Sequence, residues 1–109
     1  MIRHIVLVRF APQTEAVEIE AIWRDLRALK DSVPGILSFA AGRNDSPEGF
    51  GRGYDHGFVV DFTDRAARDA YLDHPDHVRA GARLVAATDG GVDGLLAFDL
   101  PMNDEAPRC

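Results

Sequence analysis

The chain has few of the residues that build disulfides, metal clusters or membrane spans. Its single cysteine is the last residue, Cys109, so we expect no internal disulfide and no cysteine metal cluster. No apolar run approaches the roughly 20 residues of a membrane span, and residues 2–6 lack the pattern of a signal peptide. Basic residues number 12 against 18 acidic ones, and the net charge of −6 disfavours nucleic acid and membranes as partners. We therefore expect a cytoplasmic protein that binds neither.

Glycine is concentrated in one polar segment, residues 42–53, which includes a GxGxG spacing. A phosphate-binding loop needs a strand directly before the glycines and a helix directly after them, and this segment has neither. We expect a flexible loop here. The sequence also contains no Walker loop and no serine nucleophile elbow, so neither nucleotide binding nor serine catalysis is predicted.

The remaining composition is that of a small globular domain, with 46% hydrophobic and 28% charged residues in 109. Separate cores seldom form below about 50 residues each, so the chain holds one domain. We place this domain at residues 1–101 and a polar C-terminal tail at 102–109.

Hydrophobic periodicity predicts an α+β fold. Strands are expected at 4–10, 36–41, 54–62 and 95–100, where β-branched or alternating apolar residues gather. An amphipathic helix follows Thr14 as its N-cap and ends before Val33-Pro34-Gly35. A short helix capped by Asp64 or Thr63 runs to a break at 74–75, and residues 77–88 are helical again. This order is ferredoxin-like, with a four-stranded antiparallel sheet and helices on one face.

Two strands carry an alternating apolar face that begins with histidine. The faces are His4, Val6, Val8 and Phe10 in one strand, and His56, Phe58, Val60 and Phe62 in the other. We expect this surface to be the side of the sheet without helices, because it is too apolar for water. A second copy packed sheet against sheet would cover it, which predicts a homodimer.

The candidate chemistry rests on histidine and tyrosine. Imidazole exchanges protons near neutral pH, and a phenol can donate a hydrogen bond to an oxyanion. Tyr71 precedes His74 and His77 in one helix–turn segment, while His4 and His56 begin their strands. The predicted catalytic residues are His77, Tyr71, His4 and His56. Side chains expected to line the pocket beside them are Val6, Val8, Phe58 and Trp23.

Structural roles compete with each of these assignments. A histidine at a strand start is more often an ordinary, partly buried residue than a catalyst. His74, before a proline, can cap a helix end, and Trp23 falls on the apolar period of its helix, which favours the core. His74 and His77 have ligand-like spacing, but no third ligand stands out, so we expect no zinc site and no cofactor.

Several segments together resemble a known family. They are His4-Ile5-Val6, Val33-Pro34-Gly35-Ile36, Gly42, Gly53-Tyr54-Asp55-His56 and the Tyr-x-x-His-Pro-x-His element at 71–77. Over about residues 2–100 the chain resembles the stress-responsive A/B barrel (Dabb) family, and the last element is the most specific part. The resemblance implies a ferredoxin-like fold that pairs as a dimeric α/β barrel.

The resemblance also implies a function for the predicted site. In a plant branch of the family, of the olivetolic acid cyclase type, a cofactor-independent polyketide cyclase closes a ring by aldol condensation. Its catalytic histidine corresponds to His77 and its supporting tyrosine to Tyr71, while His4 and His56 match further polar positions. Phe58 is bulkier than the small aliphatic residue expected on its strand.

The implied activity is binding of a small apolar carbonyl or phenolic compound, with cyclase- or lyase-like acid–base chemistry. Two alternatives stay open. One is a non-enzymatic stress-response or ligand-binding homodimer, and the other is an oxygenase of the dimeric α/β barrel superfamily.

Overall fold

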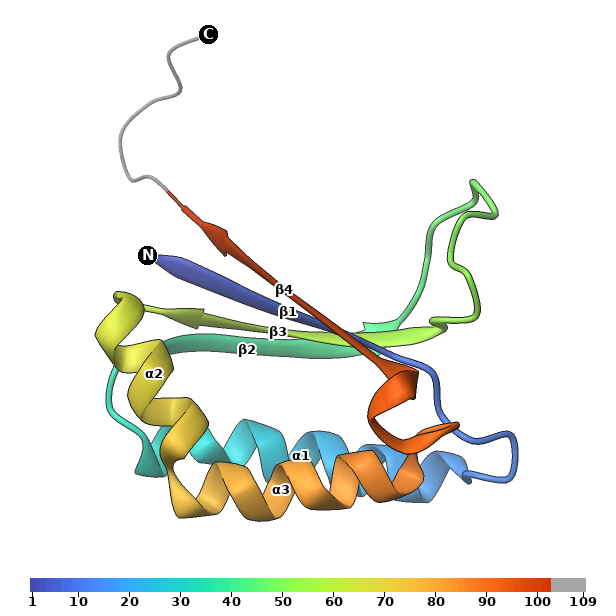
Figure 1. Ribbon diagram of the computed structural model, residues 1–109, viewed down its shortest axis with the longest axis horizontal. Coiled ribbons are helices and arrows are strands. Elements are labelled where there is room, and N and C mark those ends of the chain that lie inside the picture. Colours follow the sequence, from blue (N-terminus) through green and yellow to red (C-terminus); the bar gives the residue numbers. More distant parts are fainter. Residues whose placement is uncertain (103–109) are drawn as a thin grey trace, which may run out of the picture.

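The computed structural model describes residues 1–102, which form one antiparallel sheet with helices on one side (Figure 1). The elements in chain order are β1 (Ile2–Val8), α1 (Ala16–Ser32), β2 (Ile36–Arg43), β3 (His56–Phe62), α2 (Arg65–Asp73), α3 (Pro75–Ala87), a short 3-10 helix η1 (Gly91–Gly94) and β4 (Leu95–Pro101). The ferredoxin-like prediction is confirmed. Nearly all of the predicted polar tail, with Cys109, lies outside the described residues.

The sheet places β1 at its centre. The strand order is β2-β3-β1-β4, and every neighbouring pair is antiparallel. In this register His4 on β1 lies between Val60 on β3 and Asp99 on β4. Residues directly opposite each other share a face, so these three side chains lie on the same side of the sheet.

The helices cover the face that the sequence predicted to be open. Val6, Val8 and Phe58 are 6%, 0% and 4% exposed, and they pack beneath the helices. The prediction of an uncovered His4–Val6–Val8 face is therefore wrong. Ile5 and Leu7 make the opposite face of β1 apolar as well, so alternation along the strand could not distinguish the two sides.

No helix of residues 1–102 lies on the opposite side of the sheet, and we call this side the open face. Its apolar members on β4 are Leu96, Phe98 and Leu100, which are 42%, 56% and 41% exposed. The loop between β2 and β3 rises on this side of the sheet, away from the helices (Figure 1). The open face is thus a broad apolar surface bordered by a projecting loop.

Local capping explains where the helices begin. Glu15, and not Thr14, occupies the N-cap of α1, because the Thr14 hydroxyl donates to the Ala87 carbonyl at 3.2 Å instead. Of the two predicted caps, Asp64 and Thr63, it is Asp64 that caps α2, by accepting from the Ala67 amide at 2.9 Å. His74 ends α2 and also caps α3, so the third helix starts two residues earlier than the sequence suggested.

The core between helices and sheet is rich in aromatic rings. Phe58 lies 5.7 Å from Trp23 and 5.9 Å from Phe39, measured between ring centroids. Trp23 is 3% exposed, which confirms its predicted core position. In the described part of the chain, no helix has both the length and the apolar character to cross a bilayer.

The turn before β2 depends on Gly35. Its φ is +90°, and a Cβ built on it would lie 2.5 Å from the Cβ of Ala67 on α2. Gly35→Ala is therefore expected to lower the free energy of unfolding by about 1–3 kcal/mol. Gly81→Ala is the matched control: a Cβ there meets nothing within 4 Å on α3, and a helical Gly→Ala change should stabilise by about 0.5–1 kcal/mol. Urea unfolding of both variants measures the contrast, and equal effects would contradict this account.

Candidate functional site

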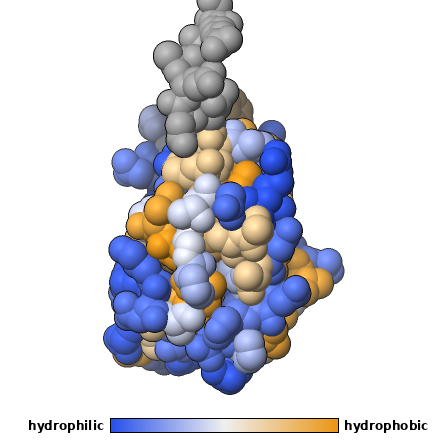
Figure 2. All heavy atoms as spheres, turned by 90° about the vertical axis from the view of Figure 1, so that its left-hand side faces the viewer, coloured by the Kyte–Doolittle hydropathy of each residue, from blue (hydrophilic) through white to orange (hydrophobic). Residues whose placement is uncertain are grey.

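Three of the four predicted catalytic side chains lie together under one end of the molecule. The rings of Tyr71 and His77 are 4.4 Å apart, and those of His4 and Tyr71 are 6.1 Å apart, between centroids. They come from α2, α3 and β1. Figure 2 looks onto the end of the molecule where α2 lies, and its surface there alternates hydrophilic and hydrophobic patches. The structure thus brings together residues more than 60 positions apart in sequence.

His77 is oriented by the turn between α2 and α3. Pro75 occupies the first turn of α3, and the His74 ring caps that helix by accepting from the Asp76 amide at 3.1 Å. This turns His77 back toward α2, where its Nδ1 lies 3.2 Å from the Leu72 carbonyl. A carbonyl only accepts, so Nδ1 carries the proton and donates. In the neutral ring, Nε2 then holds the lone pair.

The environment of His77 favours that neutral ring. Burial lowers the pKa of His77 below its ordinary value, and the hydrogen bond to the Leu72 carbonyl opposes this only in part. The nearby His4 and His74 rings lower the pKa further. A half-buried, uncharged imidazole with a free Nε2 can accept a proton at neutral pH.

Tyr71 presents a phenol with no protein partner. The side chain is 1% exposed, and its hydroxyl makes no hydrogen bond to any residue in the range 1–102. Burial raises the pKa of Tyr71, so the hydroxyl keeps its proton across the physiological range. Leaving a buried hydroxyl unpaired costs about 1–3 kcal/mol. A bound ligand or an ordered water would satisfy this hydroxyl.

His4 is held by an acidic residue that the sequence reasoning missed. Its Nδ1 lies 2.5 Å from Asp99 Oδ1, and Asp99 Oδ2 accepts from Arg68 at 3.0 Å. Burial opposes ionisation of Asp99, but the hydrogen bonds from His4 and Arg68 outweigh it and hold the pKa of Asp99 below its ordinary value. The only signal for Asp99 in the sequence is a lone acid inside the apolar run at 95–100.

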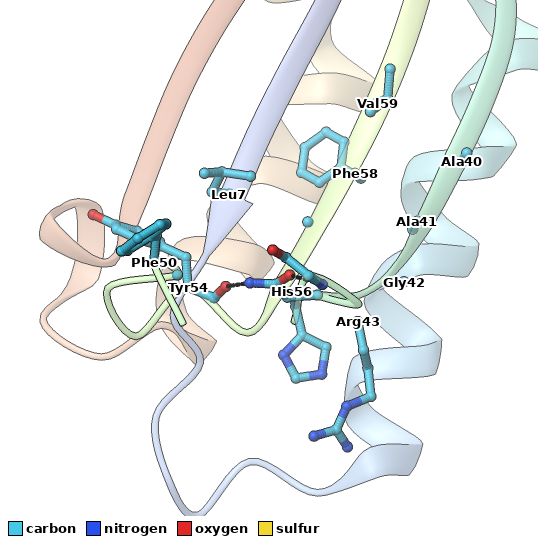
Figure 3. Close-up of a pocket in the computed structure, with 14 residues that line it drawn as sticks. Leu7, Ala40, Ala41, Gly42, Arg43, Phe50, Tyr54, His56, Phe58 and Val59 are labelled. Carbon is cyan, nitrogen blue, oxygen red and sulfur yellow. Dashed lines mark hydrogen bonds between the residues drawn. The ribbon is translucent and has the colours of Figure 1, made fainter. Parts of the chain in front are cut away.

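His56 lies at the other end of the sheet. His56 pairs with Val8, whereas His4 pairs with Val60. His56 and Val60 are four residues apart along β3. At the rise of a strand this separation is about 13 Å. His56 shares the helix-covered face but points toward a different region, beside Arg43 (Figure 3). Burial, followed by the Arg43 charge, lowers the pKa of His56. The prediction of a single site with all four side chains is therefore wrong for His56.

The residues predicted to line a pocket are mainly core residues. Val6 and Val8 are packed in the core, as are Phe58 and Trp23. A hollow of about 520 Å³ lies elsewhere, where the β2–β3 loop meets the sheet (Figure 3). Phe58 lines this hollow, and Trp23 lines a second hollow, which also borders His56. His4, Tyr71 and His77 line neither of the two.

Metal binding finds no support in the described residues. Between residues 1 and 102 there is no group of three or more His, Cys, Asp or Glu side chains placed to hold a metal ion. The polar atoms of His4, Tyr71 and His77 instead combine hydrogen-bond donors and acceptors with aromatic walls from Phe58 and Phe62. That combination suits a small organic ligand with a polar group.

The fold and these side chains define a class of protein: a small ferredoxin-like domain with polar groups gathered between one end of its sheet and its helices. Residues 2–101 match the model of the Stress responsive A/B Barrel Domain, Dabb. The chain belongs to the stress-responsive A/B barrel (Dabb) family.

Individual relatives agree with this assignment. A stress-response A/B barrel domain-containing protein of Arabidopsis thaliana is 26% identical over 101 residues, covering 92% of this chain and 85% of that protein. A dimeric ferredoxin-like protein from Jannaschia sp. CCS1 is 37% identical, with a TM-score of 0.86 over 93% of this chain and 98% of that one. A hydroxynitrile lyase from Passiflora edulis shares the fold at 20% identity, with a TM-score of 0.83 over 97% and 96% of the two chains.

Proposed function

We propose that the site formed by His77, Tyr71 and His4 binds a small carbonyl or phenolic compound and transfers a proton without a cofactor. His77 Nε2 accepts a proton from the carbon beside the carbonyl. The Tyr71 hydroxyl donates a hydrogen bond to the oxygen on which negative charge develops. His4 orients the ligand from the sheet side.

One observation carries this proposal: the rings of Tyr71, His77 and His4 lie together, and the Tyr71 hydroxyl is buried without a partner among residues 1–102. The Tyr71 hydroxyl is buried and unpaired, and the hydrogen bonds of His77 and His4 involve only Nδ1 among the residues of the described range. A buried hydroxyl that served the fold alone would be paired, because an unpaired buried group is costly. A ligand oxygen would accept from the Tyr71 hydroxyl, and a transferable proton on the ligand would meet His77 Nε2.

The relatives lend support of a general kind. A fold neighbour is named a hydroxynitrile lyase, which is compatible with lyase-like chemistry on this scaffold. Kinship with polyketide cyclases of the olivetolic acid cyclase type is part of the proposal, and it rests on His77 and Tyr71. His56 lies too far from these residues to act with them.

Proton transfer can be tested without knowing the natural substrate. In deuterated water, a base at the site should exchange the methyl protons of acetophenone, a small aromatic ketone, faster than buffer does. NMR follows the loss of the methyl signal for wild type and for His77→Ala. Binding of acetophenone without exchange would favour the non-enzymatic alternative. A Soret band in the purified protein would favour a haem-dependent oxygenase instead.

We also propose that the protein is a homodimer, paired through the open face. Exposed apolar side chains on β4 need a cover, and the Jannaschia relative is named as dimeric. The charged pair on this face can be buried without an unpaired charge, because Arg3 donates two hydrogen bonds to Asp61, at 2.9 and 3.1 Å, and Ser38 donates a third. A cytoplasmic location remains a prediction.

Phe98→Glu tests the dimer. Phe98 is 56% exposed in the middle of the apolar row on β4, and two buried glutamates across a two-fold interface would repel each other. We expect weakening of the dimer by about 100-fold or more. Light scattering should give about twice 11.9 kDa for wild type and 11.9 kDa for the variant. The control, Val17→Glu at a 72% exposed position on α1, should stay dimeric. A monomeric wild type would refute the proposal.

A further inference from the structure

Asp99 bridges two parts of the candidate site. One of its oxygens faces the His4 ring on β1, and the other accepts from Arg68 on α2. Arg68 lies three residues before Tyr71 on the same helix, so the bridge also ties the helix that carries the phenol to the sheet edge. Arg68 is itself steadied by Asp69, to which its Nε donates at 3.0 Å.

We propose that Arg68 and Asp99 are positioning residues that set the tautomer of His4 and thereby select ligands that carry a hydroxyl group in addition to a carbonyl. Only the ligand selection rests on the proposed function, and the tautomer assignment is independent of it. An ionised carboxylate accepts and never donates, so it requires the proton of His4 on Nδ1. The neutral ring then presents Nε2 as an acceptor.

The charged and titratable groups around His4 are consistent with this assignment. Asp99 faces it from β4 with Arg68 behind, Tyr71 faces it from α2, and His77 lies beyond Tyr71 on α3. Arg68 only donates, so it keeps one carboxylate oxygen occupied and leaves the other for His4. In the neutral His4 ring, Nδ1 therefore has to carry the proton.

The donor and acceptor pattern of the site defines the ligand class. Tyr71 offers one donor, while His77 Nε2 and His4 Nε2 offer acceptors. A bare ketone supplies an acceptor for Tyr71 and an acidic C–H for His77, but nothing for His4. A hydroxylated ketone supplies the missing donor. The aromatic neighbours of His4, Phe58 and Phe62, favour a phenolic ring as its carrier.

The tautomer can be read directly from nitrogen-15 NMR of the His4 ring, at a pH high enough that the ring is neutral. Wild type should show a protonated Nδ1 and an unprotonated Nε2. Asp99→Asn should reverse this. Arg68 requires an oxygen, so the asparagine must direct its only oxygen to Arg68 and its NH₂ group to His4 Nδ1, which then has to accept. The proton would move to Nε2.

Two further variants distinguish a change of tautomer from a loss of the folded structure. Arg68→Ala alone should keep the wild-type tautomer, because the carboxylate still only accepts. The double variant Arg68→Ala/Asp99→Asn frees the amide to rotate, so its oxygen can face His4 and restore the wild-type tautomer. A reversal in Asp99→Asn that the double variant rescues cannot come from misfolding. An unchanged tautomer in Asp99→Asn, or a proton on Nε2 in wild type, would overturn the positioning role.

Ligand selection is measured with acetophenone and its three ring-hydroxylated derivatives, the isomers of hydroxyacetophenone, titrated by NMR against wild type and Asp99→Asn. At least one isomer should bind wild type about ten-fold more tightly than acetophenone, through one added hydrogen bond. That advantage should fall in Asp99→Asn, where Nε2 donates and the hydroxyl of the ligand has to accept through its oxygen, which in a phenol is the weaker role. A reversed tautomer with no preference for any isomer would overturn the ligand class. A reversed tautomer with no binding of any probe would refute the proposed function and leave the positioning role intact.

Discussion

Replacing Phe62 by alanine is expected to lower the free energy of unfolding by about 3–5 kcal/mol, the usual cost of removing a large buried ring. Phe62 ends β3 with 0% exposure and lies edge-on to Tyr71, with 4.9 Å between ring centroids. Removal of the ring leaves a cavity between the sheet and α2. Backbone hydrogen bonds of β3 to β1 and β2 hold the site open, so it cannot collapse to fill the gap.

Urea unfolding at one fixed protein concentration gives the measurement, because the stability of a dimer depends on concentration. Val17→Ala, at a 72% exposed position on α1, is the control and should change stability by less than about 0.5 kcal/mol. In a domain of this size a loss of 3–5 kcal/mol corresponds to a melting temperature lower by about 12 °C or more. A loss below about 1 kcal/mol would mean that the helix layer is not packed on β3 as described.

The architecture could be predicted from the sequence, but the assignment of the two sheet faces could not. Strand and helix periods differ sharply between residues 2–10 and 16–32, and the proline and glycine at 34–35 mark the turn, so the element order was readable. The side that receives the helices was not readable, because β1 alternates between two apolar faces. Only the packing of α1 and α3 against Val6 and Val8 decides it.

The candidate site shows the same division between local and long-range information. The tyrosine and histidine at 71–77 lie in one segment, so their proximity follows from the helix, turn and helix that hold them. Asp99 meets His4 only through the register between β1 and β4, which no local pattern encodes. His56 was placed with His4 because both begin strands, yet antiparallel strands begin at opposite ends of a sheet.

Replacing His77 by alanine is expected to slow deuterium exchange into acetophenone by about 10²–10⁴-fold, the usual contribution of a positioned general base. The neutral ring with its free Nε2 is the base that the geometry offers, and its proton-bearing Nδ1 is fixed by the Leu72 carbonyl. Because burial lowers the pKa of His77, the ring stays uncharged down to a pH below the ordinary pKa of histidine. Exchange should therefore persist on mild acidification and be lost only once His77 is protonated.

Tyr71→Phe is the companion variant that separates chemistry from packing. Removing the buried, unpaired hydroxyl takes away a desolvation cost and no protein hydrogen bond, so the variant should be as stable as wild type or more stable by about 1 kcal/mol. Exchange should nevertheless fall by about 10²–10³-fold, because the developing enolate oxygen loses its donor. A destabilised Tyr71→Phe with normal exchange would assign the hydroxyl to the fold. If Tyr71→Phe keeps its stability but loses exchange, the Tyr71 hydroxyl acts on the ligand and not in the fold.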